Sequence, residues 1–202
     1  MMMTDPPGLF SRLHGLDWYG GMLRRWTEGL GLRPEQRVLE LGCGPGCLSR
    51  DLAARGMRVT GMDCSSRMIR HAAGAARSEA TFQVAALPLL PVDDGTYDVV
   101  LAASLLNVIK DKPAAIAEMT RVVRSGGLVS ALFPVPGFEQ AANRLARQMS
   151  GFSRAAMRQW GRSGAPLNPD AVCDWFGVAG LAPLSISGAL EGGIAIVTGR
   201  KL

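Results

Sequence analysis

Short, fully apolar runs alternate along this chain with longer stretches in which apolar residues recur every three or four positions. The short runs have the length of buried strands, and the longer stretches have the spacing of amphipathic helices. We interpret as strands the runs 38–41, 58–62, 81–85, 97–102, 128–133, 184–186 and 194–197. The helical spacing covers 9–32, 48–57, 65–71, 111–123, 137–167 and 171–178. Strands that alternate with helices predict an α/β fold with a largely parallel sheet.

The amino-terminal stretch predicts a helical cover over the rest of the chain. We expect residues 1–8 to be a disordered lead and the spacing over 9–32 to form two amphipathic helices. The Gly20-Gly21 pair is the expected break between them, since glycine weakens a helix.

A strand, a glycine turn and a helix follow one another between residues 38 and 48. The apolar run Val38–Leu41 leads directly into glycines at 42, 44 and 46. Glycine lets the backbone turn sharply and leaves room for a ligand to lie against it. Such a unit begins a nucleotide-binding βαβ fold, although a dinucleotide fingerprint would need glycine at position 47, which is Cys47.

An acidic residue closes the second predicted strand. Asp63 lies 17 residues after Gly46, close to the spacing expected for the acid that follows such a turn. A carboxylate at this strand end can accept hydrogen bonds from both ribose hydroxyls of an adenosine. The alternative is that Asp63 only caps the following helix.

Composition limits the class of protein. The 202 residues suffice for one α/β domain, and 48% hydrophobic with 19% charged residues is typical of a soluble globular protein. There is no Cys-x-x-Cys pair and no secretion signal at the amino terminus, so we expect reduced cysteines and a cytoplasmic protein. The net charge of +5 suggests an anionic partner.

The run Glu40-x-Gly42-x-Gly44-x-Gly46 resembles motif I of the class I S-adenosylmethionine (SAM)-dependent methyltransferases. Further segments match that family in order: Asp63, the Tyr97–Ala102 strand with the stretch after it, and the glycine pair before the fifth strand. The resemblance covers about residues 37 to 133. It is strongest to the small-molecule, type 11-like branch, whose members act on quinones, lipids and metabolites.

The resemblance implies a Rossmann-like, doubly wound sheet of seven mostly parallel strands, with an antiparallel last strand and a helical lid. We therefore expect one SAM-dependent methyltransferase domain over 1–202. Its expected parts are an N-terminal helical cover (1–33), a cofactor-binding core (34–136), a basic helical lid (137–167), and a closing helix and strands (168–202).

The resemblance also implies SAM as cofactor and a set of residues around it. The implied cofactor-binding residues are Glu40, Gly42, Cys43, Gly44, Gly46, Asp63, Cys64, Met68, Gln83, Ala85 and Ser104. Relatives often carry an acid just before a Leu-Pro pair, where it contacts the adenine amino group. This chain has no acid before Leu87-Pro88, so Gln83 or backbone groups must take that role. We see no metal-binding cluster.

The acceptor side departs further from the family pattern. Many relatives have two histidines where this chain has Asn107 and Val108, and the departure removes an obvious general base. His14 and Tyr19 are the candidate catalytic residues, because N-terminal helices line the acceptor pocket in similar proteins. Aromatic residues that merely anchor a helix to the core remain the alternative.

Segment 137–167 is strongly basic. It holds one acid, Glu139, and the arginines at positions 144, 147, 154, 158 and 162, with apolar residues at helical spacing and a break expected near Gly151. Three interpretations stay open: a lid with a solvated basic face, a surface for an acidic acceptor or an anionic membrane, and an RNA-binding face. We rank RNA last, since no recognised RNA-binding motif accompanies the charge.

The predicted function is transfer of the SAM methyl group, by in-line displacement, to a nucleophile on a small-molecule or lipid-like acceptor. The alternatives are a non-catalytic SAM-binding regulatory or scaffold subunit and an RNA methyltransferase that uses 137–167. The sequence names neither the acceptor atom nor the oligomeric state.

Overall fold

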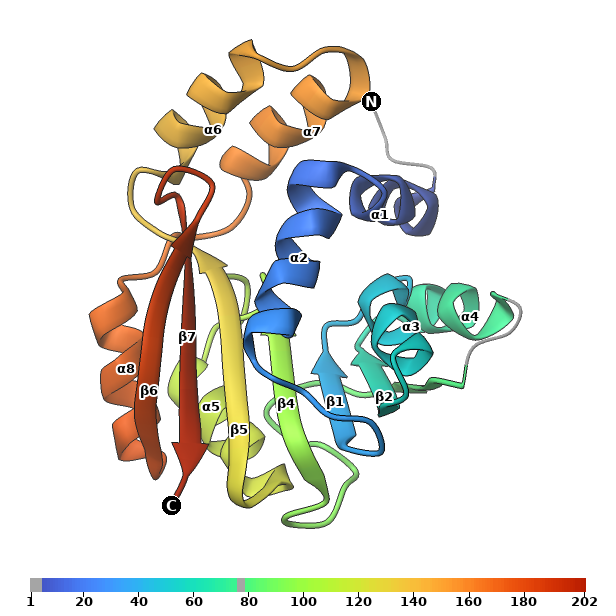
Figure 1. Cartoon of the computed structure of the whole chain (residues 1–202), viewed down its shortest axis with the longest axis vertical. Coiled ribbons are helices and arrows are strands. Elements are labelled where there is room, and N and C mark those ends of the chain that lie inside the picture. Colours follow the sequence, from blue (N-terminus) through green and yellow to red (C-terminus); the bar gives the residue numbers. More distant parts are fainter. Residues whose placement is uncertain (1–4, 76–78) are drawn as a thin grey trace.

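The computed structural model describes residues 5–75 and 79–202, and its centre is one twisted sheet (Figure 1). The strands are β1 (Arg37–Leu41), β2 (Arg58–Asp63), β3 (Thr81–Val84), β4 (Tyr97–Ala103), β5 (Val123–Pro134), β6 (Leu181–Ala189) and β7 (Ile194–Lys201). The helices are α1 (Pro6–His14), α2 (Asp17–Gly29), α3 (Cys47–Ala54), α4 (Ser66–Gly74), α5 (Lys112–Val122), α6 (Phe138–Arg147), α7 (Gly151–Gly161) and α8 (Pro169–Val178).

The strand order across the sheet is β3-β2-β1-β4-β5-β7-β6. Strands β1 to β5 are mutually parallel, and β7 is antiparallel to both β5 and β6. The order reverses between β1 and β4, which is where open α/β sheets bind ligands at their carboxyl ends. The predicted Rossmann-like fold with seven strands, the last of them antiparallel, is thus confirmed.

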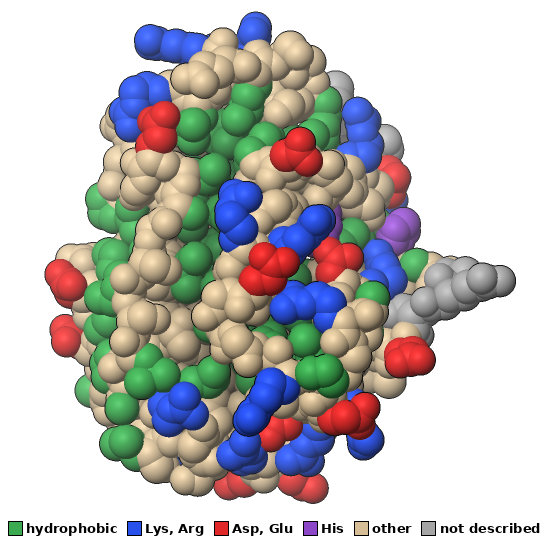
Figure 2. Space-filling model, viewed as in Figure 1, with side chains coloured by type: hydrophobic (Ala, Val, Ile, Leu, Met, Phe, Trp, Pro, Cys, Tyr) green, Lys and Arg blue, Asp and Glu red, His purple; other side chains and the backbone are tan. Residues whose placement is uncertain are grey.

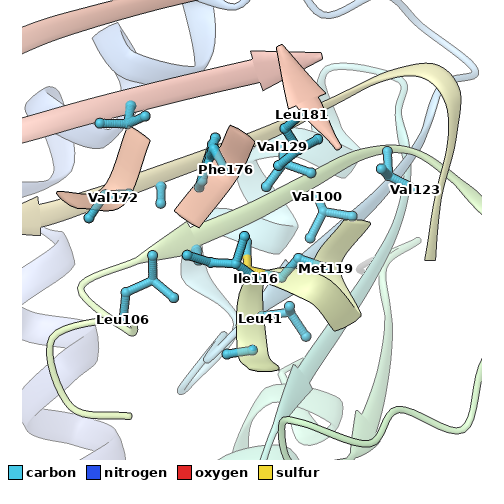
Figure 3. Packing of buried hydrophobic residues seen from close by; sticks show 14 of the residues in the cluster. Leu41, Val100, Leu106, Ile116, Met119, Val123, Val129, Val172, Phe176 and Leu181 are labelled. Carbon is cyan, nitrogen blue, oxygen red and sulfur yellow. The ribbon is translucent and has the colours of Figure 1, made fainter. Parts of the chain in front are cut away.

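Two hydrophobic layers hold the helices to the sheet. On one face, Phe176 of α8 and Met119 of α5 point into the same cluster as Val129 of β5 (Figure 3). On the other face, α2 and α3 pack on β1 and β4 through residues such as Trp26 and Leu52. This explains why the predicted core strands are apolar on both sides, because helices cover both faces.

The amino-terminal helices do not divide where we expected. Helix α1 ends at His14 and α2 begins at Asp17, so Gly20 and Gly21 lie inside α2 and the predicted break is wrong. Gly20 is needed for close packing instead: a Cβ there would lie 2.0 Å from the His14 carbonyl oxygen. The expected disordered lead is wrong for residues 5–8, because Asp5 caps α1; residues 1–4 lie outside the described part.

Another prediction to correct is the end of the fifth helix. We expected a helix over 111–123 and a strand only from 128, but α5 ends at Val122 and β5 already begins at Val123. Gly126 still has a positive φ of 72°, so the glycine serves a turn within the irregular start of the strand.

The basic segment forms the two predicted helices, with Gly151 as the first residue of α7. Together with α1 and the amino-terminal end of α2 they gather above the carboxyl ends of the parallel strands (Figure 1). Aromatic rings join the two pairs: Trp18 of α2 stacks on Trp160 of α7 with ring centres 5.8 Å apart, and Phe138 meets Trp160 edge-on. Trp18 Nε1 also donates a hydrogen bond of 2.8 Å to Ser153 Oγ. The lid and the N-terminal cover are therefore packed against each other.

All four cysteines are free thiols, as the composition predicted. Within residues 5–75 and 79–202, none of the helices has the length and apolar character that a bilayer-crossing segment requires.

Candidate functional site

The glycine turn after β1 is held by backbone bonds to the neighbouring strand. The amides of Gly42 and Cys43 both donate to the Met62 carbonyl oxygen of β2, at 2.8 and 3.0 Å. The Gly46 amide donates to the Cys43 carbonyl oxygen at 2.9 Å, which closes the turn before α3 begins. Gly42, Gly44 and Gly46 all have positive φ, so each position favours glycine.

The three glycines differ in what surrounds them. A Cβ on Gly44 would meet nothing within 4 Å, so this stretch of backbone is open to a ligand. A Cβ on Gly46 would lie 2.5 Å from the Phe82 ring, and one on Gly42 would lie 3.0 Å from the Leu105 side chain. Gly44 leaves the space that we expected for a ligand. Gly42 and Gly46 instead let Leu105 and Phe82 pack closely against the backbone of the turn.

Asp63 closes the turn from the end of β2. Its Oδ2 accepts a hydrogen bond from the Gly44 amide at 3.0 Å, and its Oδ1 accepts one from the Ser65 amide at 2.8 Å. Each carboxylate oxygen can accept a second bond, so two donors of a ligand can still be held. The capping of α4 is carried out mainly by Ser65, whose Oγ accepts from the Met68 amide. Asp63 thus joins the glycine turn to the amino end of α4 and keeps acceptor capacity on both oxygens.

Glu40 lies behind the turn and is almost fully buried, with 4% of its surface exposed. Its Oε2 accepts a hydrogen bond of 2.5 Å from Ser49 Oγ of α3. Burial raises the pKa of Glu40 to about 7, although the Ser49 bond works in the opposite direction. Glu40 therefore braces β1 against α3, and it sits close to its titration point at neutral pH.

Arg50 is a residue of the site that sequence patterns missed. Its guanidinium donates to the Pro45 carbonyl oxygen at 2.8 Å and to the Ala72 carbonyl oxygen of α4 at 3.4 Å. It therefore fixes the outer side of the glycine turn to α4. An arginine in a helix gives no sequence signal of such a role.

The remaining residues predicted around the cofactor follow β2 and β3. Cys64 is exposed directly after Asp63, and Met68 is half-buried in the first turn of α4. The Ala85 amide donates to the Asp63 carbonyl oxygen at 3.1 Å, so Ala85 is tied to the same strand end. Gln83 is exposed and points away from the sheet face that holds Phe82, since neighbouring strand residues alternate.

Ser104 follows β4 at the other side of the turn. It is a non-glycine residue with φ of 51°, and its amide donates to the Leu132 carbonyl oxygen of β5 at 2.7 Å. In the described part of the chain, its buried Oγ has no hydrogen-bond partner. Buried polar atoms without a partner are rare in native proteins and mark places where a ligand can supply one.

The two candidate catalytic residues lie in different surroundings. Tyr19 contacts Trp18 and Trp160 edge-on, and burial with the nearby Glu40 carboxyl raises the pKa of its hydroxyl well above the ordinary value. His14 lies against α3, with Nε2 3.8 Å from a carboxylate oxygen of Asp51, and burial lowers its pKa. The Tyr19 hydroxyl is therefore protonated and lies within the electrostatic reach of Glu40, whereas His14 lies beside Asp51 of α3.

Two open hollows, of about 430 and 300 Å³, lie at the opposite end of the sheet. Arg37 and Arg58 line the larger one, and both belong to the amino ends of parallel strands. Since ligands of such sheets bind at the carboxyl ends, we do not assign the cofactor to these hollows.

Comparison with known proteins agrees with the geometry. A methyltransferase domain model matches residues 39–131. A ubiquinone biosynthesis O-methyltransferase from Paraburkholderia xenovorans is 31% identical over an alignment of 165 positions, which covers 74% of this chain and 69% of that protein. The chain belongs to the SAM-dependent methyltransferase family. A demethylmenaquinone methyltransferase from Beutenbergia cavernae is 37% identical over 57% of this chain, and the match spans half of that relative's length.

Solved structures share the fold of this methyltransferase. A SAM-dependent methyltransferase from Aquifex aeolicus superposes with a TM-score of 0.73 over 98% of this chain and 99% of its own, at 14% identity. Magnesium protoporphyrin IX methyltransferase from Synechocystis, solved with bound SAH, gives 0.72 over 96% and 94%, at 18% identity.

SAM is the cofactor of this family, and the residues present fit it. The open backbone at Gly44 leaves space, Asp63 keeps one free acceptor position on each oxygen, and the unpartnered Ser104 Oγ lies across the turn. Glu40 can balance a nearby positive charge, since a cation stabilises the carboxylate form.

Proposed function

We propose that this methyltransferase transfers the methyl group of SAM to a nucleophile on a small, lipid-like acceptor such as a quinol. The observation that carries the proposal is the pairing of the open Gly44 backbone with the Asp63 carboxylate at the point where the strand order reverses. The acceptor class is supported by the relatives, whose names refer to ubiquinone and demethylmenaquinone.

The site residues would hold the cofactor in one orientation. In the proposal, Asp63 accepts bonds from the two ribose hydroxyls, and the Gly42–Gly46 turn lies along the rest of the molecule. Cys64, Met68, Gln83 and Ala85 supply contacts around the adenine, and Ser104 approaches from the β4 side.

Bound SAM supplies an activated methyl group on a positively charged sulfur. The glycine turn and Asp63 would hold SAM so that a hydroxyl of the acceptor could take this methyl group, with the carbon–sulfur electron pair left on sulfur and the hydroxyl proton passed to solvent at the edge of the site. The protein's task is to align the three atoms and exclude solvent, and alignment alone can lower the barrier by roughly 7–11 kcal/mol.

No strong base is needed for this scheme, and the surroundings of Tyr19 agree with that. Because the pKa of Tyr19 is raised, its hydroxyl stays protonated at neutral pH and serves as a hydrogen-bond donor instead of a base. His14 is neutral at that pH, since burial lowers its pKa, but its contacts are with α3. We therefore propose Tyr19 as an orienting donor and expect the His14→Phe variant to keep its turnover.

We also propose that the basic lid rests on an anionic membrane that holds the lipid-like acceptor. Basic side chains stand at the top of the molecule, over α6 and α7 (Figure 2). Arg144 and Arg162 are paired with Glu191 and Glu139, whereas Arg147 and Arg158 are exposed and have no ion-pair partner within the described residues. Unpaired arginines gain most from anionic headgroups, at about 1 kcal/mol each.

The experiment is methyl transfer from tritiated SAM to a catechol that carries a short isoprenoid tail. Labelled product supports the proposed function, and a folded, SAM-binding protein that labels no quinol or catechol contradicts it. For the membrane contact, sedimentation with phosphatidylglycerol vesicles should weaken in salt and in the Arg147→Glu, Arg158→Glu double variant. An equal loss in Arg37→Glu, at the far end of the sheet, would contradict the lid as the contact.

A further inference from the structure

A second buried polar atom in the loop after β4 has no partner. Besides Ser104 Oγ, the Oδ1 atom of Asn107 is buried without a hydrogen bond in the described part of the chain, and the whole side chain is 6% exposed. A buried acceptor that makes no bond costs free energy, since it has lost its water. Two such atoms within four residues point to a ligand and not to the fold.

The loop lies between the cofactor turn and the exit of the lid. On one side, the Leu105 side chain would be 3.0 Å from a Cβ on Gly42. On the other side, the Asn107 carbonyl oxygen accepts a bond of 3.2 Å from the Ala165 amide, in the segment that joins α7 to α8. Asn107 therefore lies between the glycine turn and the segment that leaves the lid.

The hydrogen bond that ties Asn107 to the segment after α7 is made by its backbone. Its carbonyl oxygen makes the bond to Ala165, while the side-chain oxygen contributes no bond to the fold. The carboxamide lies so close to the lid exit that a Cβ on Gly164 would be 2.2 Å from Nδ2. Leucine, which has nearly the same shape, could fill this place without an unpaired oxygen.

We propose that Asn107 orients the methyl acceptor, with Oδ1 accepting a hydrogen bond from a hydroxyl group of that molecule. The inference rests on the proposed function and narrows its acceptors to those that carry a hydrogen-bond donor. Ser104, nearer the strand end, faces the cofactor, and Asn107, nearer the lid, faces the acceptor.

The decisive variant is Asn107→Leu, with Val108→Leu as the matched control, because Val108 is exposed beside it. We expect Asn107→Leu to raise the melting temperature of the ligand-free protein by about 2–6 °C, since it removes an unsatisfied buried acceptor. Calorimetry should show unchanged SAM affinity. With the prenylated catechol as probe, kcat/KM should fall about tenfold, mostly through KM, since one hydrogen bond is lost.

Asn107→Asp keeps the side-chain oxygen, so it should retain most of the turnover that Asn107→Leu loses. A lower melting temperature in Asn107→Leu would show a structural role and overturn the inference, as would a loss of SAM affinity, which would assign the oxygen to the cofactor. If the wild type does not methylate the catechol, the proposed acceptor class fails. The melting and SAM measurements then still decide whether Asn107 serves a ligand other than SAM.

Discussion

The turn after β1 and the loop after β4 lie side by side at the carboxyl ends of neighbouring strands, yet their buried polar side chains differ in hydrogen bonding. In the turn, Glu40 is bonded to Ser49, and Asp63 is bonded to two backbone amides. In the loop, the buried side-chain oxygens of Ser104 and Asn107 lack partners within the described residues. The carboxylates of the turn are thus bonded within the protein, whereas the two loop oxygens are left to ligands, in our proposals Ser104 to the cofactor and Asn107 to the acceptor.

The largest expected effect tests how tightly the turn is built. In Gly46→Val, the new side chain would meet the Phe82 ring and the Ala72 methyl group at a position with φ of 74°. We expect a loss of about 4 kcal/mol in the free energy of unfolding, because overpacking and a left-handed conformation both cost. Urea denaturation measures it, and a loss below that of Gly44→Val would contradict the packing role.

The next effect concerns the charge behind the turn. The pKa of Glu40 is raised to about 7 in the folded protein, so the folded state binds the proton more tightly than the unfolded chain. Glu40 therefore stabilises the ligand-free protein fully below its unfolded pKa, and this contribution is lost as pH rises through about 7. The loss approaches about 3 kcal/mol, at 1.36 kcal/mol per pKa unit.

Glu40→Gln keeps an acceptor for Ser49 but does not titrate. Its unfolding free energy, measured against the wild type from pH 5 to pH 9, should lack this decline. Parallel pH curves for the two proteins would show that Glu40 is already ionised. Saturating SAM should flatten the wild-type curve, since a nearby cation favours the carboxylate.

Gly44→Val separates ligand binding from folding. The side chain has free space in the ligand-free protein, but it would occupy the position expected for the cofactor. We expect SAM affinity to fall by at least about 100-fold, or about 2.7 kcal/mol, while the protein stays folded. Retained micromolar binding in calorimetry would mean that the cofactor does not lie against this backbone.

The smallest effect tests the contact between cover and lid. Trp18→Phe removes the bond from Nε1 to Ser153 Oγ and should cost about 1 kcal/mol in unfolding free energy. SAM affinity should stay unchanged, and Ser153→Ala is the matched control. A greater loss in SAM affinity than in stability would place Trp18 in the cofactor site.

Much of the fold could be predicted from sequence because the signals are local. The apolar runs predicted β1, β2 and β4, and the helical spacing over 171–178 predicted α8. The break between α1 and α2 could not be predicted, since the place of Gly20 depends on contact with the His14 carbonyl group. Close approach between helices leaves no local pattern.

The site residues likewise divide into those with a local sequence signal and those that depend on partners distant in the chain. Gly44 and Asp63 were predicted because their spacing along the chain reflects the turn. Arg50 and Phe82 were missed, since each acts through a partner distant in sequence. The sequence marked Asn107 only as a departure from the family pattern; its unpaired oxygen became visible in the folded protein.

The most direct test of the central claim is calorimetric titration with SAM and S-adenosylhomocysteine, on the wild type and on Asp63→Asn. Asp51→Asn is the matched control, because Asp51 is a half-exposed carboxylate on α3. We predict micromolar binding to the wild type and to the control, and a loss of about tenfold or more in Asp63→Asn, since charge-assisted bonds to the ribose are weakened. Equal affinity in all three proteins, or no binding to a folded wild type, would contradict the assignment of the cofactor to this turn.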